Sequence, residues 1–242
     1  MLPDDCKQGL STGTKAGCQI LWDRGDLMRF VGIDPATTTG FVALDEEGNV
    51  LVATDVRGEG KRIPGGISTG MLVSLENKVY NLLRPGDIIA IEEPAVHTQM
   101  AVTAGMIHGG LRSMIYRKEL EFVDVNPQRT KGFVNRNQRV ESSEKKKHVA
   151  AGVLEHYGFE HSSDNVADAY IIARIAQAVY RVKNGASLDL YTSYQQRIIQ
   201  AILQPEAKPP KSKKGKSQTV KRPGKPAAAG SHIQNTEQTL LF

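Results

Sequence analysis

The sequence is poor in cysteine and has neither a long apolar run nor an apolar segment near its start. Cys6 and Cys18 are the only cysteines among 242 residues, and their spacing matches neither a metal site nor a disulfide framework. This usage favours a reducing, cytoplasmic environment. No run approaches the roughly 18 apolar residues of a membrane-spanning helix, so no membrane span is expected. Asp4, Asp5 and Lys7 interrupt the first residues, which excludes a secretory signal peptide.

The net positive charge of the chain comes from its last part. The net charge is +5, but residues 204–242 carry eight Lys or Arg against Glu206 and Glu237. This segment therefore has a charge of +6, and residues 1–203 together have −1. Because the segment is also rich in Pro, Ser, Gly and Ala, we expect a disordered basic tail.

The chain divides into three parts by composition. Residues 1–27 show no hydrophobic period and contain four glycines, which predicts a disordered leader. Met28 directly precedes the first predicted strand and is a candidate for the true start. We therefore expect a leader at 1–27, one domain at 28–203 and the tail at 204–242.

The hydrophobic periods between residues 28 and 203 predict an α/β fold. The order of elements is three strands, a helix, a strand, a helix, a strand and then helices only. This order predicts a mixed five-stranded sheet flanked by helices, with a three-strand antiparallel meander followed by parallel strands. Strands are predicted at 29–34, 39–45, 49–55, 88–91 and 120–125, and helices at 69–83, 98–118, 142–157, 163–179 and 188–203, with a short helix after Asn126-Pro127.

Four acidic residues are expected to meet at one edge of this sheet. Asp34 closes the first strand and Glu92 closes the fourth, and the ends of adjacent parallel strands lie about 5 Å apart. Asp164 and Asp168 are four residues apart at a helix start and share one helix face. Carboxylates so close repel one another unless a divalent cation lies among them. Oxygen ligands suit Mg²⁺, or Mn²⁺, and two such ions about 4 Å apart can hydrolyse a phosphodiester.

Structural alternatives exist for each acid. Asp34 on its own fits an Asx-turn, and Asp164 fits a helix N-cap. Glu93 could be the ligand in place of Glu92. Strand alternation favours Glu92, because it shares a face with Ala90 whereas Glu93 points to the other side.

Three segments with these acids resemble a known family. Gly32-Ile-Asp34-Pro-Ala-Thr-Thr-Thr-Gly40, Ala90-Ile-Glu92-Glu-Pro94 and Asp164-Asn-Val-Ala-Asp168-Ala-Tyr-Ile-Ile-Ala173 resemble, in order and spacing, the acidic motifs of RuvC-like Holliday junction resolvases, in particular the phage members. The resemblance covers about residues 28–183. It implies an RNase H-like fold, a homodimer, and Mg²⁺-dependent cleavage of four-way DNA junctions in a bacterial or phage-infected cell.

The resemblance also implies roles for individual residues. The family's catalytic and metal-binding acids correspond to Asp34, Glu92 and Asp168, with Asp164 as the fourth. The usual bacterial pattern places the penultimate ligand three residues before the last acid, which is Asn165 here, whereas Asp164 lies four before it. Helix geometry allows either residue, so both stay open as ligands.

Basic residues after the fifth strand are expected to bind DNA. The segment from Val123 to Lys131 resembles the part of the family that leads from this strand into DNA-contacting residues. Three lysines in the first turn of the next helix oppose the helix dipole, so they do not serve stability. The predicted phosphate contacts are Arg129, Lys131, Lys145, Lys146 and Lys147.

The end of the sequence predicts a protein partner. Gln238, Leu241 and Phe242 resemble the Gln-x-x-Leu-Phe peptide that docks bacterial DNA polymerase sliding clamps. Exposed apolar residues on a flexible tether usually bind a partner, although a frayed end or a strand that packs back on the domain is an alternative.

Three other functions compete with that of a junction resolvase. A sugar-kinase or actin-like ATPase also begins with Gly-Ile-Asp, but it needs two such domains and leaves the Asp164–Asp168 pair unexplained. An inactive nucleic-acid-binding relative is disfavoured, because all four acids are present. An RNase H-like nuclease that acts on RNA or on other branched DNA stays as the alternative.

Overall fold

The structure is a computed structural model, and it describes residues 28–61, 63–64, 66–94, 100–135 and 144–205. The leader at 1–27, residues 206–242 of the predicted tail, and residues 142 and 143 of the helix predicted at 142–157 lie outside the described residues. The side chains of Lys145 and Lys146 also lie outside them.

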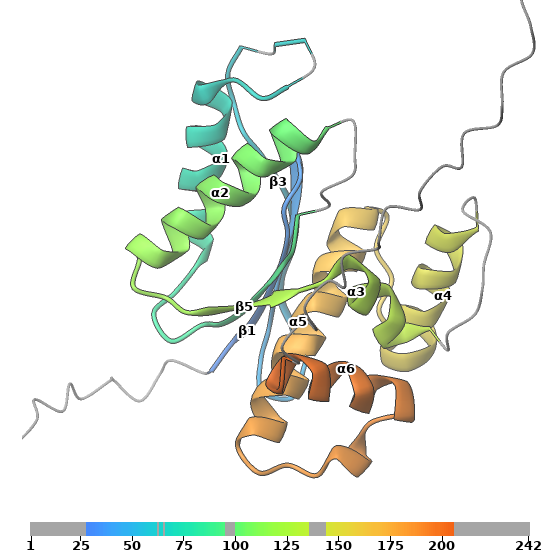
Figure 1. Ribbon diagram of the computed structural model, residues 1–242. Coiled ribbons are helices and arrows are strands. Elements are labelled where there is room, and N and C mark those ends of the chain that lie inside the picture. The colour runs from blue at the N-terminus through green and yellow to red at the C-terminus, as the bar shows by residue number, and fades with distance from the viewer. Residues whose placement is uncertain (1–27, 62, 65, 95–99, 136–143, 206–242) are drawn as a thin grey trace, which may run out of the picture. The chain divides into compact units, whose positions relative to one another are not determined.

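Five strands form one mixed sheet, as the sequence predicts (Figure 1). The order across the sheet is β3-β2-β1-β4-β5. β1, β2 and β3 pair antiparallel, whereas β4 pairs parallel with both β1 and β5. The strands are β1 (Phe30–Asp34), β2 (Thr38–Leu44), β3 (Val50–Arg57), β4 (Ile88–Glu92) and β5 (Phe122–Val125).

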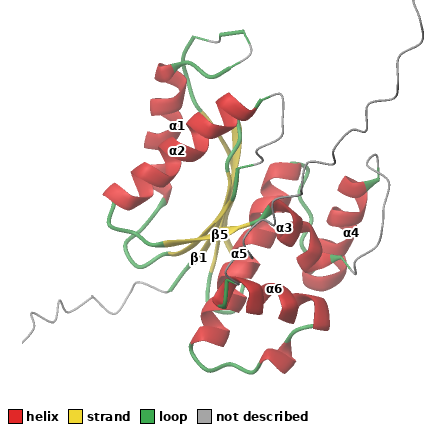
Figure 2. Cartoon of the chain, in the orientation of Figure 1, coloured by secondary structure: helices red, strands yellow, loops and turns green. Residues whose placement is uncertain are grey.

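Helices cover both faces of the sheet (Figure 2). On one face, α1 (Thr69–Leu82) and α2 (Ala101–Arg117) pack on Val31, Ile33 and Ile91. On the other face, α5 packs on β1, β2 and β4 and is itself flanked by three helices. These four helices are α3 (Pro127–Val134), α4 (Lys145–Tyr157), α5 (Asp164–Lys183) and α6 (Ser193–Leu203).

A buried ion pair joins the beginnings of the parallel strands. Arg29 donates from Nε and Nη2 to the two carboxylate oxygens of Asp87, at 2.8 and 2.7 Å. The amide of Arg84 also donates to Asp87, which fixes the turn between α1 and β4. Since β1 and β4 begin at this pair, their opposite ends arrive in register at the far edge of the sheet.

Several helix boundaries differ from the sequence prediction, including those of α5 and α6. The predicted helix at 188–203 is a short 3-10 helix, η1 (Leu188–Leu190), followed by α6. The break occurs because Thr192 and Gln195 form a capping box that starts a new helix. α5 has Ser163 as its N-cap residue, so Asp164 is the first residue inside the helix.

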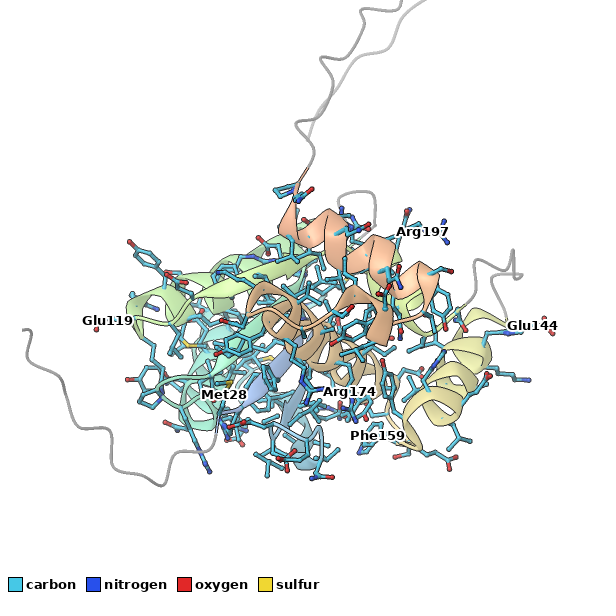
Figure 3. All side chains as sticks on the ribbon, turned by 90° about the horizontal axis from the view of Figure 1, so that it is seen from below. Met28, Glu119, Glu144, Phe159, Arg174 and Arg197 are labelled. Atoms are coloured by element: carbon cyan, nitrogen blue, oxygen red, sulfur yellow. The ribbon has the colours of Figure 1, made fainter. Side chains whose placement is uncertain are left out.

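An aromatic cluster ties the end of α4 to α5. The rings of Phe159 and Tyr170 stack with centroids 4.0 Å apart, and Tyr157 meets Tyr170 edge-on. Arg174 donates to the Tyr170 hydroxyl and lies over the Tyr157 ring; Figure 3 labels Arg174 and Phe159. This cluster holds α5 in a fixed position along its length.

Candidate active site

Asp34 and Glu92 end neighbouring parallel strands at matching positions. Ile33 lies opposite Ile91 in the β1–β4 pair, so the next residue of each strand is one of the two acids. By strand alternation, the Glu92 side chain shares the α5 face with Ala90, which belongs to the core on that side. Glu93 instead accepts from the Asn126 amide group at 3.2 Å, so it holds the N-cap residue of α3.

The turn after Asp34 is closed by another residue. The Thr39 hydroxyl donates to the carbonyl of Ala36 at 2.7 Å and accepts from its amide at 3.3 Å. This pair of contacts gives the turn its own side-chain closure, so the Asx-turn alternative is not needed to explain the position of Asp34.

Two glycines let α5 approach the sheet closely enough to bring Asp168 to these acids. A Cβ atom on Gly32 would lie 2.0 Å from the carbonyl oxygen of Ala169, and one on Gly40 would lie 2.0 Å from that of Asn165. Any side chain at either position would therefore push the helix away. Gly40 is also the residue opposite Asp34 in the β1–β2 pair, so the close approach occurs beside the acid.

The electrostatics show that three carboxylates act on one another. Burial raises the pKa of Asp34 well above its usual value, and the neighbouring Glu92 and Asp168 raise it further. Burial likewise raises the pKa of Glu92, with a further contribution from Asp168. Lys131 on α3 lowers both pKa values. The site therefore gathers acids from β1, β4 and α5 beside one cation.

A buried hydroxyl on α3 adds a further oxygen beside the acids. Thr130 is fully buried on α3, and its Oγ1 makes no hydrogen bond of normal geometry. It lies close enough to Glu92 to lower the pKa of that carboxyl.

The donor chemistry fits a hard divalent cation, although the side chains are not arranged around one. Carboxylate and hydroxyl oxygens are typical ligands of Mg²⁺ and Mn²⁺, and the raised pKa values of Asp34 and Glu92 reflect burial first and neighbouring negative charge second. Within the described ranges, no three His, Cys, Asp or Glu side chains are placed so that they could hold a metal ion.

The remaining predicted acid lies at the first turn of α5. Asp164 is exposed, and it is not the N-cap residue, so the capping alternative is wrong by one position. Asn165 is partly buried, with its backbone against Gly40. Ser163 donates from its hydroxyl to Asp55 Oδ1 at 2.8 Å, which ties the start of α5 to β3.

The structure thus adds residues that the sequence did not single out. Asp55 on β3 is paired with Gly40 on β2, and Gly40 is in turn paired with Asp34 on β1. Its contact spans 108 residues of sequence, so no local spacing could have revealed it. The predicted DNA-binding residues Arg129 and Lys131 lie on α3, partly buried and exposed respectively.

A separate cavity of about 700 Å³ lies between the C-terminal end of α3, α4 and α6. Its lining includes His148, His156, Tyr194 and Arg197 but none of the predicted acids. The His156 ring nitrogen lies 2.6 Å from the Tyr194 hydroxyl. The carboxylate site is therefore distinct from this cavity.

Comparisons with known proteins find similarity in solved structures only. No protein-family model and no curated protein sequence matches the chain. The structure of T. thermophilus RuvC in complex with Holliday junction substrate is similar at a TM-score of 0.49 and 19% identity, over 65% of this chain and 96% of that chain. Another Thermus thermophilus RuvC structure has a TM-score of 0.48 and 19% identity, over 66% of this chain and 98% of that chain. At such scores the function has to be inferred from this chain's own residues.

Proposed function

We propose that the chain is a metal-dependent endonuclease that resolves four-way DNA junctions. One observation carries this proposal: the ends of β1 and β4 and the start of α5 bring three mutually repelling carboxylates together beside Lys131. Such a group is costly to the fold, and perturbed acids of this kind are typical of functional sites. The acidic motifs of the sequence resemble those of RuvC-like resolvases, and this resemblance supports a four-way junction as the substrate.

Asp34, Glu92 and Asp168 would hold Mg²⁺, or Mn²⁺, with Asp164 as a fourth ligand. Two ions bound there would generate the attacking hydroxide and stabilise the leaving 3′ oxygen of the phosphodiester. Lys131, which lowers the pKa values of Asp34 and Glu92, would offset the charge of the acids and contact a phosphate. Glu92 and Asp34 set the negative charge of the site, and the close packing of α5 holds Asp168 against them.

Basic residues and a second copy would complete the recognition of a junction. Arg129 and Lys131 on α3, with Lys145, Lys146 and Lys147 at the start of α4, would bind phosphates on the approach to the acids. A four-way junction is cut on two strands, and a homodimer would place one site at each of them. Gln238, Leu241 and Phe242 would dock a bacterial sliding clamp and keep the enzyme near DNA.

A cleavage assay tests the proposal directly. Purified protein is incubated with a four-way junction, a flap, an RNA–DNA hybrid and a linear duplex, each with Mg²⁺, with Mn²⁺ and with EDTA. We expect nicking of the junction above all other substrates and no product in EDTA. Preferred cleavage of the hybrid or of the flap would instead indicate an RNase H-like nuclease of another specificity. Activity in EDTA would contradict the role of the acids as metal ligands.

A further inference from the structure

The backbone carbonyl of Glu92 lies at the end of the β1–β4 pairing, where β1 offers it no amide donor. In this parallel pair the amide of Ile88 donates to the carbonyl of Arg29, and the same register continues to the ends of both strands. In a parallel ladder with this alternation, the carbonyl of Glu92 would next accept from the amide of residue 35. That residue is Pro35, which has no amide hydrogen.

Arg112 on α2 supplies the missing donor. Its Nη2 donates to the carbonyl of Glu92 at 2.9 Å and to Asp124 Oδ1 on β5 at 2.6 Å. The guanidinium therefore bridges the last residue of β4 and the neighbouring strand. The next amide along the chain, that of Glu93, already donates to the Val125 carbonyl, so both sides of this peptide are fixed.

The guanidinium is itself held in place from several sides. Its Nη1 lies 2.8 Å from Nδ1 of His108, and its Cζ lies 5.8 Å from the centroid of the Phe122 ring. Because arginine can only donate, Nδ1 of His108 accepts, and the neutral ring carries its proton on Nε2. His108 is buried on α2, and its ring also lies near the Glu92 carbonyl, so it holds the guanidinium close to this peptide.

Arg112 acts on the main chain and not on the carboxylate. α2 packs on one face of the sheet, whereas the Glu92 side chain shares the other face with Ala90. The contact therefore determines where the Glu92 backbone lies, and the backbone determines where the carboxylate can reach. A small displacement of such a ligand is enough to weaken ion binding, which is why supporting residues matter at metal sites.

We propose that Arg112, held by His108 and Asp124, is a positioning residue that fixes Glu92 for ion binding and strand cleavage. The effect on cleavage rests on the proposed function, whereas the effect on the Glu92 backbone does not. The two can therefore be measured separately.

The test compares Arg112→Met and Arg112→Lys with the control Arg117→Met. Arg117 also lies on α2, but its Nε donates to the Ser113 carbonyl and its nearest acid is Glu76 at 3.7 Å, so it does not contact β4. Amide hydrogen exchange reports the backbone around Glu92. Cleavage of a four-way junction as a function of Mg²⁺ concentration reports ion binding, and junction affinity is measured in EDTA.

We expect Arg112→Met to speed amide exchange at Glu92 and Glu93 and to raise the Mg²⁺ concentration for half-maximal cleavage by about tenfold or more. Junction affinity in EDTA should be unchanged, because Arg112 binds the main chain of β4 and not a phosphate. Arg112→Lys should lie between the wild type and Arg112→Met in both measurements, since one ammonium group cannot reach all the acceptors that the guanidinium binds. Arg117→Met should behave as the wild type in every measurement.

Unchanged exchange in Arg112→Met overturns the proposal, and so does an equal effect in Arg117→Met. Faster exchange with a normal Mg²⁺ requirement also overturns it, because ion binding by Glu92 would then not depend on this contact.

A wild-type protein that cleaves no nucleic acid contradicts the proposed function instead. In that case Mg²⁺ should still slow exchange at Glu92 in the wild type and not in Arg112→Met, and an equal response of the two overturns the positioning role. If Arg112→Met does not fold, Asp124→Asn replaces it.

Discussion

Asp34 occupies a position that is unfavourable for a carboxylate. The residue is 9% exposed, it lies beside Glu92 and Asp168, and Lys131 offsets part of their charge. Burial and like charge both disfavour the ionised form. Selection for stability alone would replace such a group, so its charge is best explained by function.

Removing one charge at this position tests that explanation. Asp34→Asn and Glu92→Gln keep the size of each side chain and remove a ligand charge, so we expect cleavage to be abolished. Junction binding should stay near normal, because neither acid contacts a phosphate. In EDTA the Asp34→Asn variant should be at least as stable as the wild type, since repulsion is relieved. Full activity in either variant would contradict the assignment.

Asp164 and Asn165 differ in what their substitution should do. If exposed Asp164 is a ligand, Asp164→Asn should reduce the cleavage rate far more than Asn165→Ala. Asn is also well tolerated near a helix start, so a structural effect of that change should be small. Cleavage rates at saturating Mg²⁺ and thermal unfolding of both variants are the measurements. A larger decrease in Asn165→Ala, with unchanged stability, would move the ligand to Asn165.

The packing of α5 on the sheet is the element on which the site depends. Gly32 and Gly40 leave no room for a side chain under Ala169 and Asn165. The contact between Ser163 and Asp55 ties the same end of the helix to β3. Together these contacts place Asp168 beside the strand ends, so the helix position is as important as the acid itself.

Gly40→Ala should therefore impair both stability and activity. The added methyl group would meet the Asn165 carbonyl at 2.0 Å, so α5 must shift, and we expect a decrease of about 1–3 kcal/mol in the free energy of unfolding. Cleavage should fall even under conditions in which the variant is fully folded. Urea unfolding and junction cleavage measure the two effects.

Gly70→Ala in α1 is the matched control for this substitution. A Cβ atom at Gly70 meets nothing within 4 Å, so the change should leave cleavage unaltered and stabilise the helix by about 0.5–1 kcal/mol. Equal impairment of Gly40→Ala and Gly70→Ala would mean that the close approach of α5 has no special role.

Regular elements were largely predictable from the sequence, because their periods are local. The convergence of Asp34 and Glu92 also followed from strand order, since adjacent parallel strands end at one edge. The division of the last helix was missed, because the capping box at Thr192 and Gln195 lies inside a continuous amphipathic pattern. The capping pattern was present in the sequence, but the apolar period concealed it.

Contacts between distant polar residues could not be predicted in the same way. Arg29 and Asp87 are 58 residues apart, and Arg112 reaches the Glu92 carbonyl from a different element. Either arginine could equally have been a solvated surface residue. Only the three-dimensional arrangement shows that one is buried with its partner and that the other replaces a donor that Pro35 cannot provide.

At the scale of the whole molecule, basic charge is divided between the domain and the tail. α4 begins with three lysines and has no acid in its first turn, an arrangement that opposes the helix dipole. Changing Lys145, Lys146 and Lys147 together to Ala should weaken junction binding and flatten its salt dependence, by up to about 0.9 for each phosphate that is no longer neutralised. Affinity measured across a range of salt concentrations gives this slope.

A matched triple substitution in the tail separates the two sources of charge. Lys211, Lys213 and Lys214 changed to Ala remove the same charge from the segment after the domain. If the lysines of α4 bind the junction specifically, their removal should reduce the preference for a junction over linear duplex, whereas the tail variant should weaken both equally. An unchanged salt slope in the α4 variant would mean that these lysines form only a solvated surface.

The last prediction concerns the segment that ends Gln238-Thr-Leu-Leu241-Phe242. Two leucines and a phenylalanine follow a stretch rich in Lys and Pro, and in the proposed complex Leu241 and Phe242 fill an apolar pocket of a sliding clamp while Gln238 donates an orienting hydrogen bond. The eight basic residues of the tail would hold DNA at the same time, so two weak contacts would combine through their effective concentration.

A 232–242 peptide titrated into purified clamp should bind, and the Leu241→Ala, Phe242→Ala peptide should not. In the full-length protein the same double substitution should reduce recruitment to clamp-loaded DNA without changing junction cleavage in the absence of clamp, because the carboxylate site is untouched. Equal binding of the native and the doubly substituted peptide would show that these residues do not dock a clamp.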